Sequence, residues 1–340
     1  MTNLNSYYFQ LAHNKLLLAQ QQISTINIIK KLFTYDKKQW NNLFEASRYR
    51  REKYMGNNVF LRATLEFSNI CDNNCKYCGM ASSNIKLNRY QLTEEELKET
   101  IDLIAENGIK QLHLVGGESQ RYNRDCLLRS ISYAKSKGLS ITAVLGKQSA
   151  AEYDDLMRNG VTRYIMKFET SNDIAFKTAK PESCLTERLA HILYAQALGI
   201  KIGTGVIIGL PNTTIDDMCK DLVLLSMINP DMASCSTFSP NADSAYRNFI
   251  AGDIELTLRF IALMRLCLKQ NVYIPSSSVL GTENQVRALK YGANVLSVNF
   301  TPHKYSDSFS MYKAKNRVKC KMDKALKIVE AAEMEIADYE

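Results

Sequence analysis

The feature that most restricts the fold is a pattern of short apolar strands alternating with amphipathic helices through most of the chain. Gly108, Gly138 and Gly160 follow expected helices, where a left-handed helix end favours glycine. The expected strands are residues 61–68, 111–115, 140–145, 162–167, 201–207, 232–237, 272–274 and 295–299. Strands that alternate with helices form parallel sheets, and eight such units complete a barrel. We therefore predict an α/β fold, a (β/α)8 TIM-type barrel that is closed or nearly closed.

The first part of the chain carries a different pattern. Residues 5 to 57 have apolar positions at helical spacing and almost no turn residues before Gly56. We expect this segment to form an N-terminal helical cap on the barrel. The 340 residues leave room for one large barrel with extensions. The predicted organisation is residues 1–58 as a helical extension, 59–315 as the barrel and 316–340 as a C-terminal helix.

Composition and cysteine usage indicate the cellular compartment of the protein. No apolar run is long enough for a membrane span, and the N-terminus lacks the basic start and apolar middle of a signal peptide. The nine cysteines are an odd number and are mostly scattered, which fits a reducing compartment better than a disulfide framework. We expect a soluble, cytoplasmic protein with no membrane partner.

The formal net charge of +8 raises the question of an anionic partner. Most of this charge is dispersed, and the one dense basic run lies between Lys313 and Lys324. We interpret this run as the solvated approach to a helix, and a docking patch for an acidic electron donor is the alternative. A nucleic-acid partner is not expected.

Three cysteines, Cys71, Cys75 and Cys78, lie close together directly after the first expected strand. Cysteine thiolates hold iron–sulfur clusters, normally four for a cubane. Three thiolates in one loop would hold three irons of a [4Fe-4S] cluster and leave the fourth iron open for another ligand. Two other interpretations are a structural zinc site, which needs a fourth Cys or His nearby, and three unrelated buried thiols. The nearest histidine along the chain is His113.

The C-x3-C-x2-C spacing, with Tyr77 before the last cysteine, resembles the signature of the radical S-adenosylmethionine (SAM) superfamily. The resemblance implies that the amino and carboxylate groups of SAM bind the open iron, and that an electron from the cluster cleaves SAM to a 5′-deoxyadenosyl radical. It also implies a small-molecule substrate and a reductant such as flavodoxin or ferredoxin. Gly116, Gly117 and Glu118, after the second expected strand, resemble the superfamily motif that contacts the SAM amino group. Glycines let a backbone approach a ligand closely.

A closer resemblance extends over roughly residues 61 to 315. The sequence Glu169-Thr-Ser-Asn, the helix near Arg188 and the run from Gly203 to Pro211 resemble the group containing the [FeFe]-hydrogenase maturase radical enzyme, methylornithine synthase and biotin synthase. This resemblance implies that Glu169 and Ser171 contact the ribose or methionyl part of SAM. It also implies that Arg188 pairs with the SAM carboxylate, which a guanidinium matches bidentately. An ordinary surface role for Arg188 is the alternative.

The same resemblance implies adenine contacts from Tyr77, largely through its backbone, and from apolar residues around Ile208. The chain departs from biotin synthase, however, at the ligands of that enzyme's second cluster. The positions that match those ligands are Val115, Ala143 and Gly203, with Ser276 to Ser278 near the arginine ligand. Biotin-synthase-type sulfur insertion is therefore not expected.

The accessory cluster of some hydrogenase maturases is also not expected, because Cys320 is the only cysteine in the matching region. The remaining cysteines are expected to be buried small apolar residues, namely Cys126, Cys184, Cys219, Cys235 and Cys267. Substrate assignments from the group are not transferred, because these departures fall at its distinguishing sites.

We predict a radical SAM enzyme that abstracts hydrogen from a small, amino-acid-like substrate in the barrel lumen, in the biosynthesis of a cofactor, unusual amino acid or natural product. The alternative is an inert module that carries a cluster or binds SAM. A carrier needs no SAM site, so Gly117, Glu118, Glu169 and Arg188 favour the enzyme. The polar residues expected to contact the substrate are Arg62, Thr64, Glu66, Ser277, Asn299, Tyr305 and Tyr312.

Overall fold

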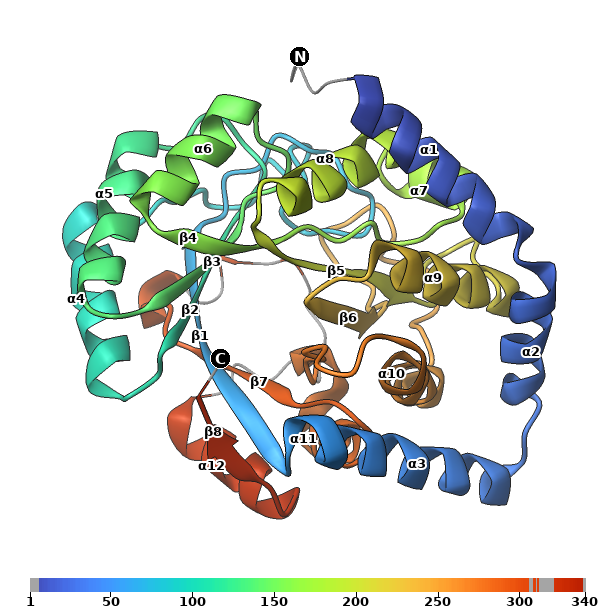
Figure 1. Cartoon of the computed structure of the whole chain (residues 1–340). Helices are drawn as coiled ribbons and strands as arrows, with labels where there is room; N and C mark the ends of the chain where they lie inside the picture. The colour runs from blue at the N-terminus through green and yellow to red at the C-terminus, as the bar shows by residue number, and fades with distance from the viewer. Residues whose placement is uncertain (1–5, 306–307, 310, 312–320, 339–340) are drawn as a thin grey trace.

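The chain forms a partial TIM-type barrel in a computed structural model that describes residues 6–305, 308–309, 311 and 321–338. The strands are parallel and follow the order β6-β5-β4-β3-β2-β1-β7, with β8 pairing on β1 (Figure 1). Their bounds are β1 Asn58–Ser68, β2 Gln111–Gly116, β3 Ser140–Val144, β4 Val161–Ile165, β5 Lys201–Ile208, β6 Met232–Thr237, β7 Val295–Asn299 and β8 Glu335–Ala337. The predicted α/β barrel is therefore confirmed.

The barrel does not close by strand pairing, because β6 and β7 are not neighbours in the sheet and the strands curl through 258°. The predicted strand at residues 272–274 is wrong as a strand. Single parallel bridges instead join Met232 to Tyr273 and Pro275 to Val295. Proline cannot donate to a strand ladder, so pairing stops after one residue on each side. An irregular segment thus spans the gap between β6 and β7.

The helices surround the sheet, and several begin with the capping residues that helix starts favour. Thr93 accepts a hydrogen bond from the Glu96 backbone while the Glu96 side chain accepts one from Thr93, a capping box for α4. The helices that follow β1 are α4 Glu94–Glu106, α5 Arg124–Ser136, α6 Ala150–Asn159, α7 Asp173–Ala179, α8 Leu185–Ala197, α9 Ile215–Ile228, α10 Ile254–Cys267, α11 Gly281–Lys290 and α12 Met322–Ala331, with 3-10 turns η1 Ser278–Leu280 and η2 His303–Tyr305.

The N-terminal extension consists of α1 Ser6–Gln21, α2 Ile23–Phe33 and α3 Lys37–Met55. Helix α1 packs on α8 and α9, α2 on α9, and α3 on α10, so the extension lies along the side of the barrel (Figure 1). Tyr54 and Met55, at the end of α3, reach the N-terminal mouth of the barrel.

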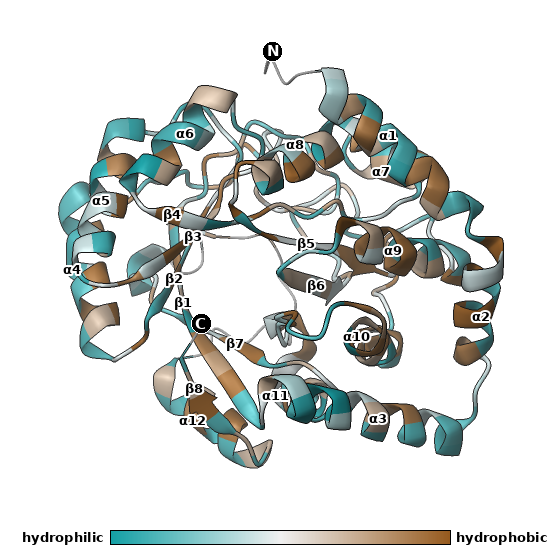
Figure 2. Cartoon of the chain, in the orientation of Figure 1, coloured by the Kyte–Doolittle hydropathy of each residue, from teal (hydrophilic) through white to brown (hydrophobic). Residues whose placement is uncertain are grey.

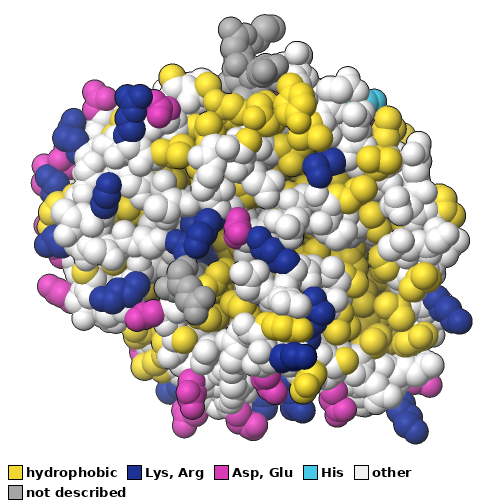
Figure 3. Space-filling view, in the orientation of Figure 1, with side chains coloured by type: hydrophobic (Ala, Val, Ile, Leu, Met, Phe, Trp, Pro, Cys, Tyr) yellow, Lys and Arg dark blue, Asp and Glu magenta, His cyan; other side chains and the backbone are white. Residues whose placement is uncertain are grey.

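The C-terminal part contains α12 and then β8, a strand that the sequence did not predict. Tyr312, Cys320 and most of the basic run from Lys313 to Lys324 lie outside the described residues. On the face shown in Figure 3, acidic side chains and Lys or Arg are interspersed along the left and lower edges. None of the described helices is long and apolar enough to cross a membrane.

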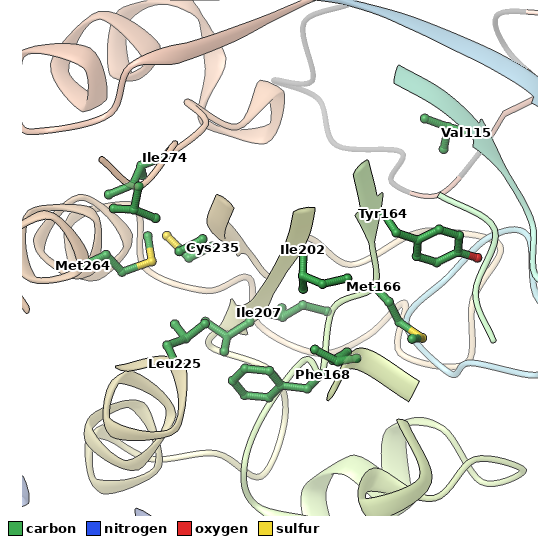
Figure 4. Close-up of a cluster of buried hydrophobic side chains, with 14 of the residues drawn as sticks. Val115, Tyr164, Met166, Phe168, Ile202, Ile207, Leu225, Cys235, Met264 and Ile274 are labelled. Atoms are coloured by element: carbon green, nitrogen blue, oxygen red, sulfur yellow. The ribbon is translucent and has the colours of Figure 1, made fainter. Parts of the chain in front are cut away.

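The core lies between the strands and their helices. Helix α10 is hydrophobic almost all round, since it is packed between α3 and β6 (Figure 2). Figure 4 shows one part of the core, where Cys235 lies beside Met264 and Ile274. The Cys235 Sγ faces the Thr257 carbonyl at 3.9 Å, toward α10.

Three of the five cysteines expected to be buried are buried, namely Cys126, Cys219 and Cys235. The expectation is wrong for Cys184 and Cys267, which are exposed. Cys184 precedes α8 and Cys267 ends α10, so both occupy helix ends rather than core-facing turns.

Candidate functional site

A cavity of about 330 Å³ opens at the C-terminal ends of the strands and collects most of the predicted site. The predicted residues that line it are Arg62, Thr64, Glu66, Cys71, Cys75, Tyr77, Cys78, Gly116, Gly117, Glu118, Glu169, Arg188 and Asn299. They come from segments that are far apart in the sequence. The fold thus brings together the cysteine loop and the motifs after β2 and β4.

The cysteine loop is held to its surroundings by backbone hydrogen bonds on several sides. The amide of Asp72 donates to the Glu118 carbonyl at 2.8 Å, and the amide of Lys76 donates to the Ala179 carbonyl at 2.9 Å. The Arg89 guanidinium donates to four carbonyls of the loop region, those of Asn69, Met80, Ala81 and Asn84. These hydrogen bonds hold the loop through groups other than its cysteine side chains.

The three cysteines suit a cubane cluster better than a single metal ion. Burial raises the pKa of the Cys71 thiol and, more strongly, that of the Cys78 thiol, and the nearby Cys75 thiolate raises both further. Three thiolates in so small a space need positive charge, which iron supplies. In the part of the chain that the structure describes, no group of three His, Cys, Asp or Glu side chains could hold one metal ion. A cubane spreads its ligands around a larger body, so the zinc interpretation is not supported.

Gly117 allows the loop after β2 to touch the cysteine loop. A Cβ at this position would lie 2.1 Å from the Ile70 carbonyl oxygen and 2.7 Å from the Cys71 Cβ. Gly146 makes room in the same way for Glu118, since a Cβ there would lie 2.2 Å from the Glu118 Cγ. Close backbone approach thus requires both glycines.

Glu118 and Arg188 form a buried ion pair, with 3.2 Å between Oε2 and Nη1. The Arg188 Nε also donates to the Lys167 carbonyl. Burial raises the pKa of Glu118, but the charges of Arg188, Lys180 and Lys147 together hold it below its usual value. Glu118 is therefore an ionised carboxylate that faces the cavity.

Glu169 has a strained backbone, with a φ of 68°. Its amide donates to the Gly205 carbonyl at 3.0 Å, and the Ile207 amide donates back to its carbonyl at 2.8 Å. The side chain accepts from the Tyr77 hydroxyl at 3.3 Å and lies 3.4 Å from the Lys167 ammonium. Left-handed backbone at a non-glycine residue often marks a functional position.

The deeper part of the cavity combines charged and neutral polar groups. Arg62 donates from Nε to the Ser297 hydroxyl at 2.7 Å. Neither ring nitrogen of the buried His113 has a hydrogen-bond partner among the described residues, and burial, with the charge of Arg62, holds its pKa well below the usual value. A second cavity of about 370 Å³ opens at the N-terminal mouth and shares Arg62, Ile165, Gly203 and Met232 with the first.

Five of the predicted residues are not placed at the cavity. Ser171 is buried, and its backbone amide donates to the Asp221 carboxylate. Ile208 is fully buried, and Ser277 caps η1 while its neighbour Ser278 lines the cavity. Tyr305 stacks on Tyr90 and donates to Glu96. Tyr312, the fifth, lies outside the described residues.

Three ionisable residues that line the cavity were missed by the sequence analysis, namely Lys167, Lys180 and His113. Lys167 could have been found, because it is the last residue of the predicted strand 162–167 and functional residues of such barrels lie at the C-terminal ends of strands. His113 could have been found because it lies two residues before Val115 on one strand, which presents such residues on one face. Lys180 gives no comparable signal, because a lysine at the end of a short helix is usually solvated.

Comparisons with known proteins show which family this chain resembles. Residues 65–225 match the family model described as the radical SAM superfamily. The chain is 33% identical over 295 residues to the [FeFe] hydrogenase maturase subunit HydE of Thermotoga maritima, covering 86% of this chain and 84% of that protein. It is 26% identical over 292 residues to the 3-methylornithine synthase of Methanosarcina barkeri, covering 85% and 83%. The crystal structure of methylornithine synthase (PylB) superposes with a TM-score of 0.80 at 24% identity, over 92% of this chain and 93% of that one.

Proposed function

This chain belongs to the radical SAM superfamily, and from that premise we propose that it abstracts hydrogen from a small, amino-acid-like substrate held in the barrel lumen. It is a radical SAM enzyme related to HydE and methylornithine synthase. The observation that carries the proposal is a single cavity that joins the three cysteines, the Glu118–Arg188 pair and a lumen with charges of both signs.

In this proposal Cys71, Cys75 and Cys78 hold a [4Fe-4S] cluster through three irons. The cluster and SAM together supply reductive cleavage of the cofactor and a hydrogen-abstracting 5′-deoxyadenosyl group. The residues of the chain bind, orient and exclude water. The fixed loop and the close approach at Gly117 keep the cluster beside the cofactor site.

Each end of SAM has a chemically matched group in the cavity. Glu118 accepts hydrogen bonds from the amino group, and Arg188 donates from its remaining Nη2 to the carboxylate. Glu169 accepts from the ribose hydroxyls, and Tyr77 lies against the adenosine. Ser171 and Ile208 do not line the cavity, so neither side chain contacts SAM in this proposal.

The substrate lies deeper, between groups of opposite charge. Arg62 and Lys167 provide positive charge, and Glu66 provides a carboxylate that accepts from Thr301 at 3.4 Å. Such a pair of charges suits the carboxylate and ammonium of a zwitterion. Asn299 and Thr64 line the same wall and supply neutral hydrogen-bonding groups.

Two other functions have less support. An inert cluster carrier would need neither the Glu118–Arg188 pair nor a polar lumen. Sulfur insertion of the biotin-synthase type would need a second set of ligands, and Val115, Ala143 and Gly203 carry none. All eight described cysteines are free, which suits a reducing, cytoplasmic setting with a flavodoxin or ferredoxin as the electron donor.

The test is anaerobic reconstitution followed by reduction with dithionite in the presence of SAM. Formation of 5′-deoxyadenosine by the wild-type protein separates the enzyme from the inert carrier. A pool of perdeuterated amino acids added to the reaction should transfer deuterium into the 5′-deoxyadenosine, read by mass spectrometry. A protein that binds the cluster but never forms 5′-deoxyadenosine would contradict the proposal. Product that forms without deuterium would reject the amino-acid-like substrate class.

A further inference from the structure

Lys180 is an almost fully buried cation with no anionic partner. Its side chain is 5% exposed and lines the cavity with Cys78 and Glu118. The backbone is fixed at the end of α7, where its amide donates to the Phe176 carbonyl at 2.8 Å and its carbonyl accepts from Ser183 at 3.0 Å. Among the described residues, none forms a hydrogen bond or ion pair with the Lys180 ammonium. Because Lys180 lines the cavity, an anionic group of a ligand bound there can reach its ammonium.

The other buried Lys and Arg side chains among the described residues all have hydrogen-bond partners, which the Lys180 ammonium lacks. Arg51 donates to the Leu289 carbonyl and to Asn57, and Arg265 donates to the Gly292 carbonyl. Arg188 donates to Glu118 and to the Lys167 carbonyl. Lys180 is therefore the exception among the four buried Lys and Arg residues of the described chain, and like Arg188 it lines the cavity that the three loop cysteines border.

The position of Lys180 identifies the chemistry of the partner. Lys180 lines the same cavity as Glu118, the group proposed for the SAM amino nitrogen, and Cys78, a proposed cluster ligand, and its charge lowers the pKa of both. The amino and carboxylate groups of SAM are attached to one carbon. A cation beside the amino-group site is therefore beside the carboxylate too. Arg188 already donates hydrogen bonds from Nε and Nη1 to groups of the protein. Few of its donors therefore remain for the carboxylate of SAM.

We propose that the Lys180 ammonium binds the carboxylate of SAM and is the principal donor to it, a role that rests on the proposed function. Arg188 then acts mainly as the residue that orients Glu118, with one remaining nitrogen for the carboxylate. The cubane and the bound carboxylate both add negative charge to this corner of the cavity. Lys180 offsets that charge where no other described cation is unpaired and buried.

The test compares SAM with decarboxylated SAM, which lacks only the carboxylate. Both ligands are titrated into reduced, reconstituted protein, and the change in the paramagnetic spectrum of the cluster reports binding. Lys180→Met removes the charge at similar length, and Lys180→Arg keeps it. Lys177→Met is the matched control, because Lys177 is exposed on the same helix. Iron and sulfide content and circular dichroism are measured for every variant.

We expect Lys180→Met to weaken SAM binding about 10- to 100-fold, the usual range for one hydrogen bond to a charged group. Decarboxylated SAM should bind the wild type and this variant equally, and Lys180→Arg should recover part of the SAM affinity. Equal weakening of both ligands, unchanged SAM affinity, or loss of the cluster from both variants would overturn the assignment. A wild-type protein whose cluster signal does not respond to SAM would instead reject the proposed function itself.

Discussion

The Arg188 guanidinium on α8 reaches across the mouth of the barrel to the Glu118 carboxylate after β2, with 3.2 Å between Nη1 and Oε2. Both side chains are largely buried, at 7% and 18% exposed. The pair joins two segments that the sequence separates widely. It holds the carboxylate in place before a ligand arrives, so an α-amino group meets an acceptor that needs no reorganisation.

Removing Arg188 should lower SAM affinity strongly. Arg188→Ala deletes a charge-assisted donor and releases Glu118, contributions worth about 2–4 kcal/mol, so the Kd for SAM should rise about 30- to 1,000-fold. Arg188→Lys should recover only part of this, because an ammonium lacks the planar fork. Cluster content should stay unchanged in both variants. The control is Arg158→Ala, whose guanidinium is 74% exposed on α6. Wild-type SAM affinity in Arg188→Ala would show that the assigned role is wrong.

The three loop cysteines should be individually required for the cluster. Cys71→Ala, Cys75→Ala and Cys78→Ala should each lose the brown chromophore, while Cys126→Ala, a buried cysteine away from the cavity, should keep it. The wild-type protein should hold one cubane, about four irons per chain. Six to eight specifically bound irons, or unchanged iron in the triple alanine variant, would count against this assignment.

Much of the barrel could be predicted because its signals are local. Period-two alternation and terminal glycines indicate β1 to β7 and the helices between them. The segment at 272–274 has the same signal but meets β6 only at Tyr273, and the next residue, Pro275, makes the single bridge to β7. Strand β8 lies near the C-terminus and pairs with β1, which is far away in the sequence, so no local pattern could predict this strand.

The site was predictable where a motif fixes residue type and spacing, as in the cysteine loop and at Glu118. It was less predictable where the direction of a side chain decides whether it reaches the cavity, because a side chain at the end of a strand can face either the lumen or the helices. Ile208 and Ser171 face away from the cavity, and Tyr305 is held by Tyr90. The role of Lys180 depends on burial that only the tertiary structure creates.

Adding one methyl group at Gly117 should disturb the cluster site. In Gly117→Ala the new Cβ would lie 2.1 Å from the Ile70 carbonyl oxygen, so backbone must move. We expect a loss of about 1–3 kcal/mol in the free energy of unfolding and a clear loss of cluster content. Gly138→Ala is the control, since it meets no atom within 4 Å but has a φ of +78°. It should cost about 1–2 kcal/mol in stability and leave the iron content unchanged. Full cluster content in Gly117→Ala would show that the loops can separate.

The last prediction concerns Asp221, which holds the segment after Glu169. Its carboxylate is buried on α9 and accepts from the Ser171 amide and the Thr170 hydroxyl. Burial raises the pKa of Asp221 to about 7, above the value of about 4 in an unfolded chain. The folded protein therefore binds a proton that the unfolded chain releases. The stability that this proton provides is present at low pH and is lost as pH rises toward 7.

Asp221→Asn should remove this pH dependence while keeping an oxygen that accepts from the Ser171 amide. We expect the stability of the variant relative to the wild type to rise between pH 5 and pH 8, by at most about 2–3 kcal/mol from the linkage of one proton over the two pH units up to the folded pKa. Urea unfolding of the cluster-free protein at both pH values, under reducing conditions, measures the difference. Asp155→Asn on α6 is the control, because Asp155 is 46% exposed and its pairing with Arg124 is loose at 3.8 Å. The same loss of stability from pH 5 to pH 8 in Asp221→Asn and wild type would mean that the buried carboxylate stays ionised, and that the hydrogen bonds from Thr170 and Ser171 outweigh its burial.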